Sequence, residues 1–261
     1  MNGRSPLVVI SWWSNCLGLA CLHALAAHTR QRPLYLVQVG KSAAQRARLR
    51  PFLPPGVQEL AYPDTAPAEH SRVIAYVVAA LPTASLWFID HDVFWQEDGE
   101  GWLETADARL HAAPYCLCLP ATNSPAITQP AFWVSPARWP AGLSFDAIPF
   151  QARPEARRPD LYRFDGAMQM PVQDTLAHAR DRLSAQGQVV TYNLADFPRH
   201  THLGGLYLLA GPLLPDAWRD WMQATVDRLN RFFADCPPAW RAIEEPVLLQ
   251  RLQTFTEALH V

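Results

Sequence analysis

Apolar and polar segments alternate regularly along the first third of the chain, at lengths typical of strands and helices. Four apolar runs have the length of a strand: residues 6–12, 34–39, 57–61 and 85–90. Three helices are predicted between them, over 16–29, 43–51 and 69–81. In the third helix, apolar side chains recur at helical spacing on one face. Alternation of strands and helices is typical of a parallel sheet whose faces are covered by helices.

The pattern after residue 95 is more mixed. Shorter apolar runs predict strands at 114–119, 131–135 and 189–192, and further helices are predicted over 175–186, 216–234 and 244–259. The segments 136–164 and 196–205 have little periodicity and predict loops. We therefore expect a single α/β domain over residues 1–261. Its half 1–95 would hold a Rossmann-type, mostly parallel sheet, and its mixed half 96–261 would end in the C-terminal helices.

The composition is ordinary for a soluble enzyme, with 49% apolar and 18% charged residues. A net charge of −2 gives no indication of a nucleic-acid or anionic-membrane partner. No run of about 18 uncharged apolar residues is present, so no transmembrane segment is expected. The five cysteines lack zinc-site spacing, and we expect buried thiols in a reducing, cytoplasmic setting. Lys41 is the only lysine, which we interpret as a bias of composition.

The most informative stretch is the apolar run 86–89, which ends in Asp90 and Asp92 with His91 between them. Two ionised carboxylates at the end of a buried strand repel each other unless a cation or a protein donor lies between them. A divalent metal that also holds phosphate oxygens is the simplest such cation. Ligands of parallel α/β sheets bind beyond the carboxyl ends of the strands, which is where this pair falls. The stretch therefore predicts a metal–phosphate site.

A similar acidic string occurs in haloacid-dehalogenase type phosphatases, where the first Asp is a nucleophile and the second an acid. In those enzymes the string normally sits on the first strand. Here it ends the fourth predicted strand, so the phosphatase is the weaker interpretation.

Four segments together resemble the GT-A glycosyltransferase fold, over most of residues 6–208. They are Leu86-Trp-Phe-Ile-Asp90-His-Asp92, Ala131-Phe-Trp-Val-Ser135, Met170-Pro-Val-Gln-Asp174 and His202-Leu-Gly-Gly205. The first is similar to the Asp-x-Asp motif that binds a divalent metal and the diphosphate of a nucleotide-sugar. The third resembles the segment whose acidic residue is the base in inverting members, although Gln173 stands where many members have Glu. The fourth is similar to the late loop whose His often completes the metal site.

The resemblance implies a role for several residues. Asp90, Asp92 and His202 would hold the metal, with His200 as the alternative histidine; this ligand set suits Mn²⁺ or Mg²⁺. The implied base is Asp174, and Asp165 is a second candidate. Donor contacts are expected from Ser11, Trp12, Asn15, Arg72, Asp90 and His91. Aromatic side chains of 94–102 and 131–139 are candidates for a sugar platform.

We therefore predict a metal-dependent glycosyltransferase that moves a sugar from a nucleotide-sugar, with a UDP-sugar as the first expectation, to the hydroxyl of an unidentified acceptor. The alternatives are a nucleotidyltransferase of the same fold and a catalytically degenerate binding or scaffold module. Nucleotidyltransferases usually carry a Gly-rich loop with Arg or Lys after the first strand, and Ser11-Trp-Trp-Ser-Asn15 is unlike it.

Overall fold

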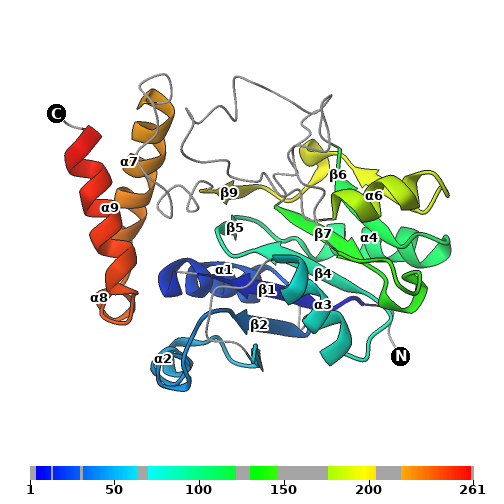
Figure 1. Cartoon of the computed structure of the whole chain (residues 1–261), viewed down its shortest axis with the longest axis horizontal. Helices are drawn as coiled ribbons and strands as arrows, with labels where there is room; N and C mark the ends of the chain where they lie inside the picture. The colour runs from blue at the N-terminus through cyan, green and yellow to red at the C-terminus, as the bar shows by residue number, and fades with distance from the viewer. Residues whose placement is uncertain are drawn as a thin grey trace.

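A seven-stranded sheet forms the centre of the protein (Figure 1). The computed structural model describes residues 4–12, 14–29, 32–63, 70–121, 130–145, 176–203 and 219–259. The strands follow the order β3-β2-β1-β4-β7-β6-β8 across the sheet. Their bounds are β1 Leu7–Ser11, β2 Leu34–Gln38, β3 Gln58–Ala61, β4 Leu86–Asp90, β6 Leu117–Pro120, β7 Ala131–Val134 and β8 Val189–Tyr192.

The sheet is mostly parallel. The strands β3, β2, β1 and β4 run parallel to one another, and β6 is parallel to β8. Only β7 is reversed within this sheet, because it pairs antiparallel with both β4 and β6. The predicted fold class, a mostly parallel α/β sheet followed by a mixed half, is thereby confirmed.

Helices cover both faces of the sheet. One face packs against α1 (Asn15–His28), α2 (Ala43–Leu49) and α4 (Glu100–Ala112), and the other against α3 (His70–Ala80) and α6 (Ala177–Ser184). Successive side chains of β1 alternate between these two cores, as the pleat of a strand requires. Both faces of β1 are therefore apolar, which explains the uninterrupted apolar run at this position of the sequence.

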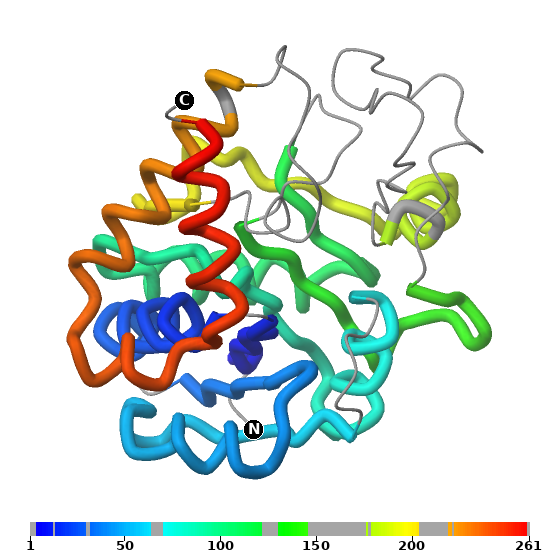
Figure 2. Tube along the Cα trace, turned by 60° about the vertical axis from the view of Figure 1, so that its left-hand side comes forward, coloured from blue at the N-terminus to red at the C-terminus, as the bar shows by residue number. Residues whose placement is uncertain are grey.

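A two-stranded ribbon and a group of C-terminal helices complete the described structure. The ribbon pairs β5 (Val93–Trp95) with β9 (His200–His202) in antiparallel fashion. The last helices are α7 (Arg219–Asp235), α8 (Pro238–Arg241) and α9 (Pro246–Leu259). Figure 2 shows α7 and α9 side by side next to α1, and their apolar faces share a core with Cys16 and Leu17 at the start of α1. Short 3₁₀ helices lie at Arg50–Phe52, Pro136–Arg138 and Leu194–Asp196.

Ser14 is the N-cap of α1, since its hydroxyl accepts a hydrogen bond from the Leu17 amide at 3.1 Å. Two local expectations differ from the structure. The segment 196–205 contains the strand β9 in addition to loop. The aromatic residues offered as a sugar platform are largely core: Trp95 and Trp133 are buried, and Trp102 packs against the core.

Helix α4 was not predicted, because its buried face is only half apolar. Leu103 and Leu110 on that face alternate with the buried carboxylates of Glu100 and Asp107. Both carboxylates pair with the buried guanidinium of Arg32. A helix that buries charges against a distant partner loses the apolar periodicity by which helices are recognised in a sequence.

Candidate metal and donor site

The acidic pair lies where the central sheet ends and the chain leaves it. Asp90 is the last residue of β4, and its amide donates to the Pro130 carbonyl at 3.2 Å. His91 and Asp92 form a two-residue turn, and Asp92 directly precedes β5. Because β5 leaves the sheet to pair with β9, the two carboxylates are held at the junction of the sheet and the ribbon.

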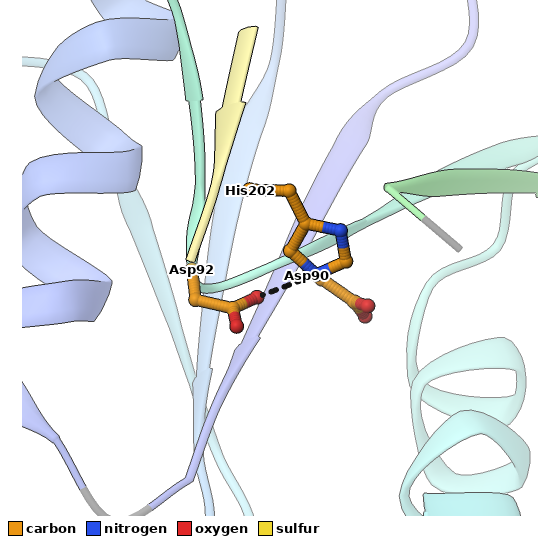
Figure 3. A group of neighbouring side chains, drawn as sticks. All are labelled: Asp90, Asp92 and His202. Carbon is orange, nitrogen blue, oxygen red and sulfur yellow. Dashed lines mark ion pairs between the residues drawn. The ribbon is translucent and has the colours of Figure 1, made fainter. Parts of the chain in front are cut away.

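The ribbon brings a histidine to this junction. His202 is opposite Val93 in the β5–β9 register, and the Leu203 amide donates to the Asp92 carbonyl at 3.1 Å. The Nε2 atom of His202 lies 3.3 Å from Oδ1 of Asp92. One ligand atom from each of Asp90, Asp92 and His202 lies within 4.8 Å of the others (Figure 3).

His200, the alternative ligand, is engaged elsewhere. It lies opposite Trp95, and its Nδ1 is 2.9 Å from the Pro198 carbonyl oxygen. Its ring also packs edge-on against Phe197. The geometry therefore groups His202, and not His200, with the two carboxylates.

The electrostatics of the trio favour a cation. Burial and the neighbouring charge of Asp92 raise the pKa of Asp90 to about 7, and His202 offsets part of this rise. Burial lowers the pKa of His202, but the hydrogen bond to Asp92 and the charges of both carboxylates outweigh it, so the pKa lies above its ordinary value. The two carboxylates repel each other when both are ionised, and a cation between them removes this repulsion. Together with the imidazole they form an oxygen and nitrogen donor set that fits a divalent ion.

The loop after β1 meets a carboxylate from the far end of the chain. Glu244 accepts hydrogen bonds from the Ser14 hydroxyl at 2.6 Å, the Asn15 amide at 2.8 Å and the Cys16 amide at 2.9 Å. Glu244 is buried, and it lies at the positive end of the α1 dipole. The first turn of α1 is therefore already occupied by an anion, and a substrate phosphate has no open amides there.

Two of the predicted donor contacts, Ser11 and Asn15, are used within the protein. The Ser11 hydroxyl donates to the Ser14 carbonyl at 3.2 Å and is buried. The Asn15 side-chain amide donates to the Ile243 carbonyl at 2.5 Å. Both side chains thus hold the β1–α1 loop in place, and Asn15 also anchors it to the segment before α9.

The other predicted donor contacts are Trp12, His91 and Arg72. Trp12 packs edge-on against His70, with 5.6 Å between the ring centroids, and lines a pocket. Burial lowers the pKa of His91, although the charge of Asp92 acts in the opposite direction. The buried Nε2 atom of His91 has no hydrogen-bond partner among the described residues. Arg72 is exposed near the start of α3.

The two candidate bases, Asp165 and Asp174, lie outside the described residues. Three other residues beside the site were missed at the level of sequence: Lys41, Glu244 and Glu245. Lys41 is buried, with 3% of its surface exposed, and its Nζ lies 2.7 Å from Oε1 of Glu245. Two features of the sequence could have pointed to these residues: Lys41 is its only lysine, and Glu244 and Glu245 are adjacent carboxylates before Pro246.

The site thus consists of an acidic strand end and a partner histidine at the edge of an α/β sheet. No family model and no curated protein matches the sequence. Among solved structures, the chain is similar to the mannosyltransferase PcManGT from Pyrobaculum calidifontis, solved with GDP-Man and Mn²⁺. The TM-score is 0.47 and the identity 11%, over 98% of this chain and 75% of that one.

Two further structures are similar in fold. A putative nucleotide-diphospho-sugar transferase from Desulfovibrio desulfuricans G20 matches with a TM-score of 0.46 and 9% identity, over 99% of both chains. The bifunctional glycosyltransferase WbbM matches with a TM-score of 0.40 and 10% identity, over 53% of this chain and only 32% of its own length. At these identities the similarity concerns the fold, and the function is inferred from the site itself.

None of the helices within the described ranges is long and apolar enough to cross a membrane.

Proposed function

We propose that this protein is a metal-dependent glycosyltransferase that moves a sugar from a nucleotide-sugar donor to an acceptor hydroxyl. The observation that carries the proposal is the grouping of Asp90, Asp92 and His202, with ligand atoms within 4.8 Å, at the carboxyl end of a central parallel strand. The setting is proposed to be the cytoplasm, since all five cysteines are buried free thiols.

In this proposal, Asp90 and Asp92 hold a divalent ion, Mn²⁺ or Mg²⁺, and His202 completes or supports the ligand set. When bound, such an ion neutralises charge on the leaving diphosphate. The Asp92–His202 contact orients both side chains before the donor arrives, and the β5–β9 ribbon fixes their backbones. Much of the rate gain is expected from the alignment of the acceptor hydroxyl with the donor sugar.

Other residues are proposed to contact the donor or the acceptor. Trp12, Arg72 and His91 surround the nucleotide side, while Ser11 and Asn15 keep the loop after β1 in shape. Asp174 is proposed as the base if the reaction inverts the sugar configuration, with Asp165 as the second candidate. A retaining reaction needs no such base.

The position of Glu244 favours this function over a nucleotidyltransferase. A nucleotidyltransferase binds the phosphates of a nucleoside triphosphate with the loop after its first strand. Here the hydroxyl and amides of that loop are bound to the buried Glu244 carboxylate. A second anion at the same place would be repelled, so the phosphates are better accommodated at Asp90 and Asp92 with a cation between them.

The test is the thermal stability of the purified protein with nucleoside diphosphates, in the presence and absence of Mn²⁺. Metal-dependent stabilisation by a nucleotide is expected, since a ligand that binds only the folded state raises the melting temperature. The double variant Asp90→Asn/Asp92→Asn should lose this effect together with sugar transfer. A nucleotide effect that persists in the double variant would instead support a scaffold module, and no nucleotide effect at all would contradict the proposal.

A further inference from the structure

A pocket of about 520 Å³ lies on the side of the central sheet that α4 covers. One wall is a face of α4, where Trp102 and Arg109 lie about two helical turns apart. The opposite wall is β8, at the end of the strand order, together with the segment after it, which carries Asn193 and Asp196. The volume is within the range of small-ligand pockets.

This pocket is separate from the candidate metal and donor site. None of the three candidate metal ligands lines it. Along β4, Trp87 points to the α4 side and lines the pocket, whereas Phe88 belongs to the core on the α3 side. The pleat of the strand places Asp90 on the same side as Phe88. A ligand in this pocket therefore lies on the opposite side of the sheet from the Asp90 carboxylate.

Trp102 gives the pocket a rigid aromatic wall. Its ring packs against those of Trp87, Tyr192 and Phe197, with 5.2, 5.3 and 4.9 Å between the ring centroids. These contacts fix one side of the indole in the core, but Trp102 is only partly buried and its remaining surface lines the pocket. Because the ring is already held in place, a ligand that packs on it costs little side-chain entropy.

The polar side chains of the pocket include both donors and acceptors, with balanced charge. Arg109 contributes a guanidinium and Asp196 a carboxylate, and Thr191 and Asn193 add a hydroxyl and an amide. Within the described ranges, the side chains of Arg109 and Asp196 have neither an ion-pair nor a hydrogen-bond partner. Burial raises the pKa of the Cys118 thiol in the pocket wall and the charge of Arg109 lowers it, so the guanidinium acts on the pocket.

This combination fits a neutral sugar. A pyranose has an apolar C–H face that can pack on an aromatic ring, and its hydroxyl groups both donate and accept hydrogen bonds. The guanidinium of Arg109 can donate to two neighbouring hydroxyl oxygens, and the carboxylate of Asp196 can accept from two hydroxyl groups. A phosphate would be repelled by Asp196, and a purely apolar ligand would take both charged groups out of water without a partner.

We propose that this pocket is a carbohydrate-binding site, separate from the transfer site, that holds one neutral sugar unit of a glycan. Trp102 is the platform for the sugar ring, and Arg109 and Asp196 bind its hydroxyl groups. The proposal goes beyond sugar transfer and does not depend on it, because the pocket shares no residue with the candidate metal and donor site. In a glycosyltransferase, such a site keeps hold of a glycan by a sugar unit other than the one that reacts.

Saturation-transfer NMR of the whole protein tests the proposal, with the methyl glycosides of glucose, galactose, mannose and N-acetylglucosamine as probes. At least one glycoside is expected to receive saturation, most strongly at its ring C–H protons, with a dissociation constant on the order of 1 mM. The signal should be the same without Mn²⁺ and in Asp90→Asn/Asp92→Asn. If none of the four glycosides receives saturation, the proposal fails. A signal that disappears in the double variant also overturns it, since the sugar then lies at the transfer site.

Two exposed positions show whether the sugar lies in this pocket. Arg109→Ala and Asp196→Ala each remove a charged hydrogen-bonding group and should raise the dissociation constant about tenfold. Glu104→Ala is the control, because Glu104 is also exposed on α4 but does not line the pocket. Equal affinity in all three variants would overturn the proposal. Mn²⁺-dependent nucleotide binding should persist in each of them, so a failure here leaves the sugar-transfer proposal standing.

Discussion

The imidazole of His202 lies against the carboxylate of Asp92, with 3.3 Å between Nε2 and Oδ1, although the two residues come from distant parts of the chain. The antiparallel pairing of β5 and β9 produces this contact. It places a candidate nitrogen ligand beside the two candidate oxygen ligands at the acidic strand end.

The first prediction concerns the choice of histidine. His202→Ala should weaken Mn²⁺ binding on the order of 10–100-fold, the scale seen when groups that support a metal are removed. His200→Ala is the matched control, since His200 lies on the same strand but contacts the Pro198 carbonyl. Metal titration followed by calorimetry measures both. Equal losses in the two variants would contradict the assignment.

A second prediction follows from the raised pKa of Asp90, which is about 7 compared with an ordinary value of 3.8. Between these values the unfolded chain has lost a proton that the folded protein keeps. The free energy of unfolding of the metal-free protein should therefore fall as the pH rises through this range. The raised pKa of His202 acts in the same direction, because its contribution is lost as the pH rises through the folded-state value.

Metal binding should reverse this trend, because ligands must lose their protons to bind an ion. The rise in melting temperature caused by Mn²⁺ is expected to be larger near about pH 8 than near about pH 5. Thermal denaturation at the two pH values measures it, with Asp92→Asn as the comparison. A stabilisation that is independent of pH would argue against a metal bound by these carboxylates.

A third prediction concerns Glu244 at the start of α1. Glu244→Gln places an amide group where the hydroxyl of Ser14 and the backbone amides of Asn15 and Cys16 need an acceptor. The loss is expected to be about 1–3 kcal/mol of unfolding free energy, because a buried donor is left without a partner. Urea denaturation measures it. The exposed change Glu257→Gln should alter the unfolding free energy by no more than about 0.5 kcal/mol.

A fourth prediction concerns the opposite end of the sheet. The Arg32 guanidinium is fully buried and pairs with Glu100 at 2.8 Å and with Asp107, while it also donates to the Ser5 carbonyl at 2.9 Å. Arg32→Leu removes the buried cation that both carboxylates share and should cost about 3–5 kcal/mol of unfolding free energy.

Arg4 provides the control for this network. It also pairs with Glu100, at 3.8 Å, but its side chain is 40% exposed. Arg4→Leu should cost no more than about 1 kcal/mol, as is usual for an exposed ion pair. Because Ser5 precedes β1, this network is far along the strands from Asp90, and Arg32→Leu should leave nucleotide affinity unchanged in the fraction that remains folded.

Much of the fold was predictable from local patterns. The apolar runs of β1, β2 and β4 and the one-sided helix α3 are each visible within a short window of sequence, because pleat and helix periodicity are local properties. The helix predicted over 175–186 is present as α6, and Gly187 follows it with a φ of +67°, a backbone conformation that suits glycine. Helix α4 was not visible in this way, since its buried carboxylates find their partner in Arg32.

The sequence by itself determined the α/β sheet and the position of Asp90 and Asp92 at a strand end, because both depend on neighbours along the chain. Tertiary structure alone decided that His202 joins the pair, that Glu244 occupies the start of α1 and that Lys41 meets Glu245 at a pocket. Each of these contacts joins residues far apart in sequence. Strand pairing and helix packing bring them together, and no periodicity in the chain encodes such a meeting.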